Sequence, residues 1–263
     1  MSDAPLRGRL LWNELMTTDL AAAERFYTAV VGWTVTPFEG STVGPYSLFT
    51  RADGVPTAGG MALPPELLAH QVPPHWMLYV GAPSLDAAVA DAQRLGATVL
   101  SPVIAVPTVG RMQTLADPQG AAFTVLEPAP SSEGSPEAPP QLGDASWVEL
   151  MTTDAEAALR FYVDLFGWQP LEAIDMGPMG KYHMFGRHLG PLGGMMNKTP
   201  DMAKIPSNWG IYFRVSDIAA ATERVKANGG QVLNGPMEVP GGDWIVNCLD
   251  PQGAAFSLHA AKR

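Results

Sequence analysis

The first regular pattern in the chain is an alternation of side chains over residues 10–17 that is typical of a β-strand. A helix is predicted next, over residues 20–31, because Phe26, Tyr27 and Val30 recur at helical spacing. Thr18 or Asp19 would cap its first turn, and Gly32 would end it. One face of the strand would carry Leu10, Trp12, Glu14 and Met16, and the other Leu11, Asn13, Leu15 and Thr17.

The order of one strand, one helix and three strands is then written a second time. After the first helix the pattern predicts strands over residues 33–37, 46–50 and 57–63, and then a proline-rich link over 64–74. The next strand is predicted over 76–80, and the next helix starts at Ser84 or Asp86 and ends near Gly96. The turn sequence Asp117-Pro118-Gln119-Gly120 joins the last two of three further strands, which are predicted over 99–105, 111–116 and 121–127.

The second half of the chain repeats this order, and the repeat is visible in the sequence itself. The segment from Trp12 to Asp19 returns from Trp147 to Asp154 with seven of its eight residues unchanged. Residues 117–123 return without change at 250–256. Shorter matches join Arg25-Phe26-Tyr27 to Arg160-Phe161-Tyr162, Gly32-Trp33 to Gly167-Trp168, and Gly59-Gly60-Met61 to Gly193-Gly194-Met195.

A proline-rich stretch separates the two copies and has the composition of an extended, semi-stiff linker. We therefore predict a first domain over residues 1–128, a linker over 129–143 and a second domain over 144–263. Whether the strand-helix-strand modules pair within one half or across the two halves stays open at this point.

Composition narrows the class of protein. Hydrophobic residues make up 46% of the 263 residues and charged residues 16%, so a core can be buried. The net charge of −10 argues against nucleic acid and anionic membranes as partners. We find no signal peptide in Met1–Arg9 and no apolar run of the roughly 18–20 residues that cross a bilayer, so a cytoplasmic protein is expected. The single cysteine, Cys248, is interpreted as a buried apolar side chain, with a catalytic thiol as the alternative.

The repeated motifs resemble the vicinal oxygen chelate superfamily, which includes glyoxalases, bleomycin-resistance proteins and extradiol dioxygenases. The carriers of this resemblance are the helix opened by Thr-Thr-Asp, its Phe-Tyr and Gly-Trp pairs, and the closing Asp-Pro-Gln-Gly turn. The chain looks closest to a tandem two-domain branch related to the mycobacterial 27-kDa antigen and to proteins labelled hydroxylases. The resemblance implies an α+β fold of two tandem glyoxalase-like domains, each a pair of βαβββ units whose curved sheet surrounds a cavity.

Catalytic members of this superfamily hold a divalent metal in the cavity through His, Gln or Glu. The resemblance places those ligand positions at Trp12 and Trp147, at Met77 and Gly210, at Met61 and Met195, and at Thr124 and Ser257. Indole and thioether groups are poor ligands for zinc, nickel or iron. We therefore predict no metal and no other cofactor. A divalent metal held by Glu149, His183 and His259 is the alternative.

Two kinds of side chain remain for chemistry on the predicted cavity wall. Glu14 and Glu149 lie two residues beyond the replaced ligand positions, and His259 lies two beyond Ser257. Paired with a histidine, either His259 or His75, each glutamate could transfer protons, because burial raises a carboxyl pKa. The alternative is that the two glutamates have a structural role and only accept hydrogen bonds from buried donors. Ligand contacts are predicted for Trp12, Met77, Arg111, Thr124, Trp147, Tyr212, Trp244 and Ser257.

Three functions are compatible with these residues. The first is a metal-free protein that binds a small apolar or carbonyl metabolite between Trp and Met side chains, for example in detoxification. The second is a glyoxalase-like lyase, isomerase or hydroxylase that uses Glu14 or Glu149 as a base. The third is a scaffold with filled cavities. We expect a monomer or a homodimer whose partner is a small molecule.

Overall fold

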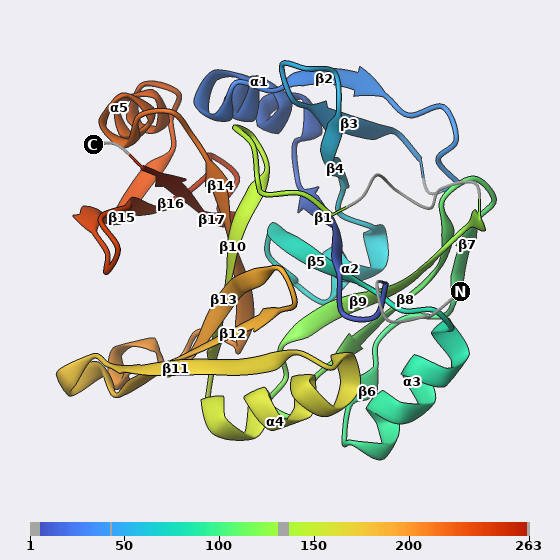
Figure 1. The fold of residues 1–263 in the computed structure, drawn as a ribbon. Coiled ribbons are helices and arrows are strands. Elements are labelled where there is room, and N and C mark those ends of the chain that lie inside the picture. The colour runs from blue at the N-terminus through green and yellow to red at the C-terminus, as the bar shows by residue number, and fades with distance from the viewer. Residues whose placement is uncertain (1–5, 43, 131–136, 262–263) are drawn as a thin grey trace. The chain divides into compact units, whose positions relative to one another are not determined.

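The computed structural model describes residues 6–42, 44–130 and 137–261 (Figure 1). The first half contains β1 (Leu10–Thr17), α1 (Leu20–Val31), β2 (Thr34–Pro37), β3 (Tyr46–Thr50), β4 (Pro56–Ala62), α2 (Pro65–Ala69), β5 (His75–Gly81), α3 (Leu85–Arg94), β6 (Thr98–Val99), β7 (Ile104–Val106), β8 (Gly110–Ala116) and β9 (Ala122–Pro128). The second half contains β10 (Ala145–Thr152), α4 (Ala155–Phe166), β11 (Gln169–Asp175), η2 (Gly177–Met179), β12 (Lys181–Arg187), β13 (Gly190–Asn197), η3 (Pro200–Met202), β14 (Asn208–Arg214), α5 (Ile218–Ala227), β15 (Gln231–Glu238), β16 (Trp244–Leu249) and β17 (Ala255–Ala260).

This is the predicted α+β fold, in which each of four modules has its first strand parallel to its last. The parallel pairs are β1 with β4, β5 with β9, β10 with β13, and β14 with β17. Parallel strands need a crossover, and the helix of each module together with the strands between the parallel pair supplies it. The strand orders are β2-β3-β4-β1, β5-β9-β8-β6, β11-β12-β13-β10 and β14-β17-β16-β15.

The compact parts of the molecule do not follow the two halves of the sequence. Residues 6–11, 78–130 and 148–209 form one compact unit, called unit 1 here. Residues 12–77, 137–147 and 210–261, apart from position 43, form the other, called unit 2. Each unit therefore takes one βαβββ module from each half, and the chain passes from one unit to the other inside β1, β5, β10 and β14. The question left open by the sequence is answered in favour of pairing across the halves.

Each unit has its own aromatic core, and two of the duplicated tryptophan pairs, Trp33 with Trp168 and Trp76 with Trp209, lie in these cores. Trp33 and Trp168 are each 1% exposed. Trp33 stacks on Phe49 in unit 2, and Trp168 stacks on Phe185 in unit 1. Because these rings are large and fully buried, they supply much of the apolar area that holds each pair of modules together.

A buried chain of hydrogen bonds runs through each core and joins one half of the sequence to the other. In unit 1 the Trp209 indole N–H donates to the hydroxyl of Tyr162 over 3.0 Å, and that hydroxyl donates to Asp117 over 3.1 Å. Asp117 also accepts two backbone N–H groups of its own turn, and burial raises its pKa above the usual value. The Asp117 carboxylate thus fixes its own turn and also accepts a hydrogen bond from a tyrosine in the other half of the sequence.

Unit 2 contains the same chain built from the other copy of each residue. The Trp76 indole donates to Tyr27 over 2.9 Å, and Tyr27 donates to Asp250 over 3.1 Å. Burial raises the pKa of both Tyr27 and Asp250. A second reciprocal pair joins Trp33 to the carbonyl of Gly143 over 2.9 Å and Trp168 to the carbonyl of Gly8 over 2.8 Å.

Most predicted elements are confirmed, and the first helix matches residue for residue. Asp19 caps it by accepting the Ala22 N–H, and Gly32 ends it with φ +91°. The strand predicted over 99–105 is instead two short strands, β6 and β7, because proline interrupts the segment at position 102. The link predicted over 64–74 contains the short helix α2, which starts at Pro65, where a missing N–H costs nothing.

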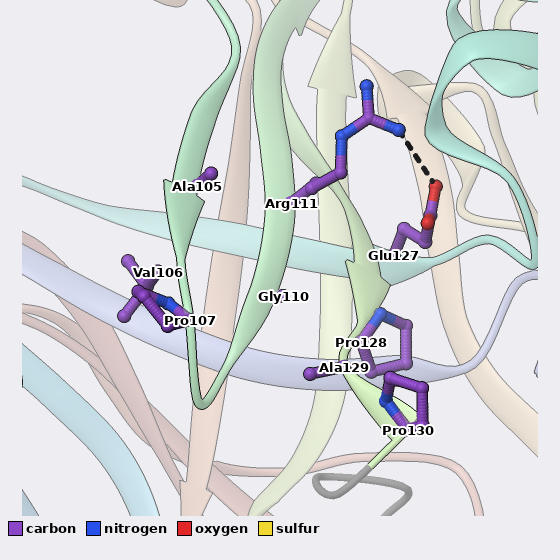
Figure 2. A pocket seen from close by; sticks show the side chains of 9 residues that line it. All are labelled: Ala105, Val106, Pro107, Gly110, Arg111, Glu127, Pro128, Ala129 and Pro130. Atoms are coloured by element: carbon purple, nitrogen blue, oxygen red, sulfur yellow. Dashed lines mark ion pairs between the residues drawn. The ribbon is translucent and has the colours of Figure 1, made fainter.

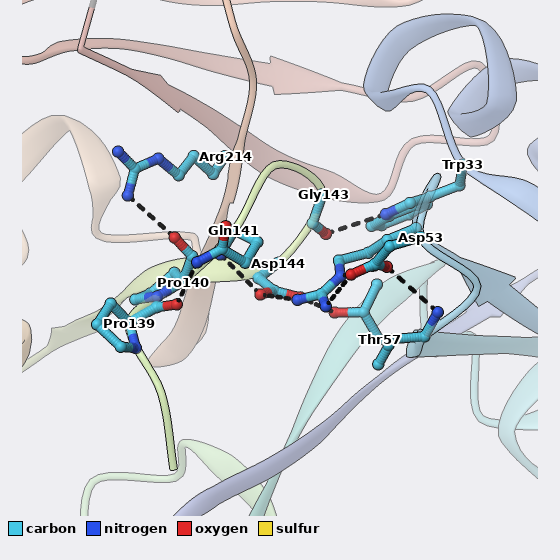
Figure 3. A network of polar contacts seen from close by, with 11 residues as sticks. Trp33, Asp53, Thr57, Pro139, Pro140, Gln141, Gly143, Asp144 and Arg214 are labelled. Carbon is cyan, nitrogen blue, oxygen red and sulfur yellow. Dashed lines mark hydrogen bonds and ion pairs between the residues drawn. The ribbon is translucent and has the colours of Figure 1, made fainter. Parts of the chain in front are cut away.

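The end of the predicted linker is not a free spacer in the part that the structure describes. Figure 3 shows residues 139–144 held in a polar network. Arg214 donates to the carbonyl of Pro140 over 3.1 Å, and Arg51 forms an ion pair with Asp144. Thr57 also donates to Asp144, over 2.8 Å. The segment before β10 is therefore anchored within unit 2 by charged and backbone groups.

Candidate functional site

The strands of each module have one face packed on a core and one face turned away from it. We call the second face the non-core face. Leu15 and Leu150 are fully buried in the two cores. Since successive side chains alternate in a strand, Glu14 and Glu149 lie on the non-core face. Thr124 and Ser257 are placed on this face in the same way, between core residues of β9 and β17.

Glu14 is the centre of a polar cluster in unit 2. It is 6% exposed and interacts with the hydroxyl of Tyr46. That hydroxyl also accepts the Trp12 indole N–H over 2.9 Å. Burial, and then the charge of Glu14, raise the pKa of Tyr46 far above its usual value. The tyrosine therefore stays protonated and acts as a donor to the carboxylate.

Glu149 has an equivalent tyrosine in unit 1. The Tyr182 hydroxyl donates to Glu149 over 3.0 Å. Glycines make both arrangements possible. A Cβ on Gly59 would lie 2.0 Å from the Tyr46 hydroxyl, and a Cβ on Gly194 would lie 2.1 Å from the Tyr182 ring. Each tyrosine thus lies across a strand position where only glycine fits.

The strand register corrects one match made from the sequence. Glu14 pairs with Gly59, whereas Glu149 pairs with Gly194 and not with Gly193. The two Gly-Gly-Met motifs are therefore shifted by one residue relative to each other. Met195 is fully buried in a core, so it does not lie on the non-core face where it was predicted. The residue equivalent to Met61 is Met196, which pairs with Met151 as Met61 pairs with Met16.

Hydroxyl and amide groups gather on the non-core face of the remaining strands. In unit 1 the hydroxyls of Thr114 and Thr124 bond each other over 2.9 Å. In unit 2 the Asn247 amide donates to Ser257 over 2.8 Å and to the Tyr212 hydroxyl over 3.3 Å. Thr124 and Ser257 are thus already paired within the protein, and their partners Thr114 and Asn247 belong to no motif that is visible in the sequence.

His259 takes part in a second polar arrangement in unit 2. Its Nδ1 lies 2.8 Å from the Ser146 hydroxyl, and its Nε2 lies 2.8 Å from Asp243. The side chain of His259 is 17% exposed and that of Asp243 is 45% exposed. Both ring nitrogens of this histidine therefore have hydrogen-bond partners. Neither Ser146 nor Asp243 was recognised in the sequence.

Two predicted ligand contacts lie on the other face. Arg111 is paired with Glu127 across β8 and β9, and forms ion pairs with Glu127 and with Asp86 of α3. Its strand neighbour Leu115 is a core residue, so Arg111 faces the helix side rather than the side of Thr124. Trp244, at the matching position of β16, likewise packs against a core.

A hollow of about 260 Å³ adjoins Arg111 and Glu127 (Figure 2). The other lining residues come from the β7–β8 hairpin and the end of β9, and most are small or proline: Ala105, Val106, Pro107, Gly110, Pro128, Ala129 and Pro130. Because both charged groups are engaged with protein partners, this hollow offers few polar groups to a ligand.

The remaining predicted site residues are dispersed. Met77 is 5% exposed and alternates with the core residue Trp76. Trp147 is half-buried and alternates with Val148, which places it on the non-core face. His75 bonds the backbone of Pro73, and burial lowers its pKa. His183 pairs with the core residue Met195 in β12 and β13, so it faces away from Glu149.

The side chains at the family's ligand positions do not suit a divalent metal. Trp12 offers a donor that is already used, Met61 a thioether, and Thr124 a hydroxyl bonded to Thr114. Among the described residues, no three His, Cys, Asp or Glu side chains gather as a set that could hold a metal ion. The alternative set is not brought together, since Glu149 and His183 face opposite ways. Nor does any helix in the described part of the chain combine the length and apolarity needed to span a membrane.

Family models match both halves of the sequence. Residues 13–126 match the "Glyoxalase-like domain", and residues 145–258 match the "Glyoxalase/Bleomycin resistance protein/Dioxygenase superfamily". A Mycobacterium tuberculosis protein named "Putative glyoxylase CFP32" is 32% identical over 249 residues, which cover 94% of this chain and 92% of that protein. The "Anthracycline biosynthesis protein DnrV" of Streptomyces peucetius is 31% identical over 263 residues, covering 95% of this chain and 92% of that protein.

Solved structures share the fold at low sequence identity. The Mn(II)-bound glyoxalase from Novosphingobium aromaticivorans has a TM-score of 0.64 and 16% identity, over 97% of this chain and 83% of that one. A variant of homoprotocatechuate 2,3-dioxygenase from B. fuscum has a TM-score of 0.68 and 16% identity, over 98% of this chain and 72% of that one. At this identity the likeness concerns the arrangement of strands and helices alone.

Proposed function

Because the chain belongs to the glyoxalase/bleomycin resistance protein/dioxygenase superfamily, we propose that it binds a small apolar or carbonyl-containing metabolite without a divalent metal. The ligand would lie against the non-core strand faces that carry Trp12, Trp147 and the neighbouring methionines. An aromatic and thioether surface suits a flat apolar molecule, and the adjacent hydroxyls would orient its carbonyl oxygen.

The observation that carries this proposal is what stands at the family's ligand positions. Trp12 occupies the first of them and is bonded to Tyr46, which in turn holds Glu14. Thr124 and Ser257 occupy later ones and are bonded to neighbouring side chains. Both copies of the repeat share these replacements, so each strand face keeps a defined shape while offering no metal-binding set.

Tryptophan fluorescence and metal content test the proposal together. We expect purified protein to contain less than stoichiometric manganese, iron, nickel and zinc. An anthracycline, chosen because of the relative from Streptomyces peucetius, is expected to quench the fluorescence saturably and to the same extent with and without EDTA. A 2-oxoaldehyde thiol adduct serves as the second probe, since another relative is named as a glyoxylase.

Matched variants locate the binding face. Trp12→Phe and Trp147→Phe are expected to weaken binding about tenfold each, which corresponds to about 1.4 kcal/mol. Trp33→Phe is the control, because Trp33 lies in a core and would change the total fluorescence without changing the affinity. Stoichiometric metal whose removal abolishes binding would refute the metal-free proposal.

A second function is favoured by the two glutamate–tyrosine pairs. Tyr46 and Tyr182 hold Glu14 and Glu149 in fixed positions, and a positioned carboxylate is suited to proton transfer next to a carbonyl. A lyase or isomerase that works in this way would lose at least about a hundredfold in kcat on Glu149→Gln or Glu14→Gln. The matched variants Tyr182→Phe and Tyr46→Phe would lose less, because the carboxylate remains. Unchanged turnover in both glutamine variants would remove this candidate.

A further inference from the structure

Ser146, His259 and Asp243 of unit 2 form a hydrogen-bonded series in which each bond is 2.8 Å long. Ser146 is the second residue of β10, Asp243 directly precedes β16, and His259 lies near the end of β17. These three residues, which we call the Ser–His–Asp array, are far apart in the sequence and are brought together by the fold.

The chemistry of the partners determines which nitrogen of His259 carries the proton. A carboxylate can only accept, so the nitrogen that faces Asp243, Nε2, is the one that holds the hydrogen of a neutral imidazole. This leaves the Nδ1 lone pair directed at the Ser146 hydroxyl. The other contact of that hydroxyl, to the backbone oxygen of Tyr212, is longer at 3.3 Å. The shorter bond therefore places the serine proton on the path to the imidazole.

We propose that this array is an acyl-transfer site at which Ser146 is the nucleophile and His259 the general base for a small ester. A serine becomes nucleophilic when an adjacent base takes its proton, and a third group that orients the base completes the arrangement. Asp243 is the positioning residue, since it reaches the substrate only through His259. This inference does not depend on the proposed ligand-binding function.

The reaction proceeds through an acylated serine. Nδ1 of His259 takes the Oγ proton while Oγ bonds to the carbonyl carbon of the ester. The carbon–oxygen bond to the alcohol then breaks, and the imidazolium returns the proton to the departing oxygen. Water, deprotonated by the same nitrogen, then attacks the acyl carbon. The bond between that carbon and Oγ breaks, the imidazolium returns the proton to Oγ, and a carboxylic acid leaves.

The array is confined to one copy of the repeat. Residues 11, 110 and 126 occupy the matching positions in the other copy and are Leu, Gly and Leu. None of these can donate or accept a proton through its side chain. A polar hydrogen-bond chain kept only for the structure would be expected in both copies, as the Trp–Tyr–Asp chains are.

A fluorophosphonate probe on the full-length protein tests the proposal, with p-nitrophenyl acetate as the substrate. We expect one adduct per chain, located on Ser146 by peptide mass spectrometry, and a burst of p-nitrophenol. Ser146→Ala should abolish both, and His259→Gln should slow acylation at least about a hundredfold. Asp243→Asn should lower kcat with KM unchanged, and Asp243→Glu should recover part of that loss.

Ser47→Ala is the matched control. Ser47 lies in the same unit, but its hydroxyl donates to the carboxylate of Glu24. This variant should acylate like the unchanged protein, and near-ultraviolet circular dichroism should confirm that every variant is folded. Absence of an adduct on Ser146 in the folded protein, or an adduct that forms at the same rate in His259→Gln, would overturn the assignment. Because neither readout uses tryptophan fluorescence, failure here is distinct from failure of the ligand-binding proposal.

Discussion

Units 1 and 2 are built alike in their cores and differ on their strand faces. Both contain a buried Trp–Tyr–Asp hydrogen-bond chain with bonds of 2.9 to 3.1 Å. In both, a buried tryptophan also donates its indole N–H to the carbonyl of a glycine that is distant in the sequence. The Ser–His–Asp array occurs in unit 2, where unit 1 has Leu11, Gly110 and Leu126. The shared network maintains the architecture, whereas the unshared side chains are free to carry chemistry.

The largest effect is expected when the two halves of the sequence are separated, because each unit then loses one of its two modules. Residues 1–128 and 144–263 expressed apart should each lack a cooperative thermal transition, because Tyr27 would lose Asp250 and Tyr162 would lose Asp117. Mixing the two fragments should restore near-ultraviolet circular dichroism and one transition. Cooperative unfolding of residues 1–128 alone would contradict this expectation and would favour the domain limits predicted from the sequence.

Replacing the aspartate of each Trp–Tyr–Asp hydrogen-bond chain tests whether the two units depend equally on these bonds for their stability. Asp117→Ala and Asp250→Ala should each lower the free energy of unfolding by about 3 kcal/mol, since each leaves a buried tyrosine hydroxyl and two backbone N–H groups without an acceptor. Urea denaturation measures both values. Asp91→Ala, at an exposed ion pair, should change stability by less than about 0.5 kcal/mol. A large difference between the first two variants would show that the units are unequal.

The indole–carbonyl bonds give a smaller, matched effect. Trp33→Phe and Trp168→Phe should each cost about 2 kcal/mol, because each loses one buried hydrogen bond and part of a ring. The same urea titration detects this loss. If either variant were as stable as the unchanged protein, its carbonyl partner would have to find another donor.

The smallest effect is expected at Cys248, which stands where the other copy has Leu115. Burial raises the pKa of the Cys248 thiol to about 12. A thiol ionises only as the pH approaches its pKa, so at pH 8 the reactive thiolate is nearly absent. Folded protein should therefore not react with a disulfide reagent until it is unfolded, and Cys248→Val should change stability by less than about 1.5 kcal/mol. Rapid reaction of the folded protein would show that the thiol is not equivalent to a core leucine.

Local chemistry explains which parts of the fold the sequence predicted. Asp19 and Gly32 fix the limits of α1 through their own hydrogen bonds and dihedral angles, so no distant residue is needed. The pairing of modules across halves could not be predicted in this way. Asp117 and Asp250 lie in identical turns, and Tyr27 and Tyr162 in identical motifs, so local sequence does not distinguish the two sets of partners.

The candidate site was only partly predicted for a related reason. Strand alternation is enough to place Glu14 and Glu149 opposite the core residues Leu15 and Leu150, but counting along the chain does not reveal that Arg111 and Trp244 face the helices. The glycines in these strands are the sequence signal for the tyrosines, because Gly59 and Gly194 each leave space for a tyrosine ring. Ser146 and Asp243 become recognisable as partners of His259 only when three separate strands are brought together.

The bond from Tyr27 to Asp250 has a consequence for how the protein is made. The two residues are 223 positions apart, so Tyr27 leaves the ribosome long before its acceptor exists. Unit 1 needs nothing beyond Trp209, whereas unit 2 waits for β17. During synthesis the part of α1 that packs on Phe256 therefore stays uncovered until the end of the chain is made, a condition under which nascent chains depend on chaperones. Unit 1 should be the first part of the nascent chain to resist proteases.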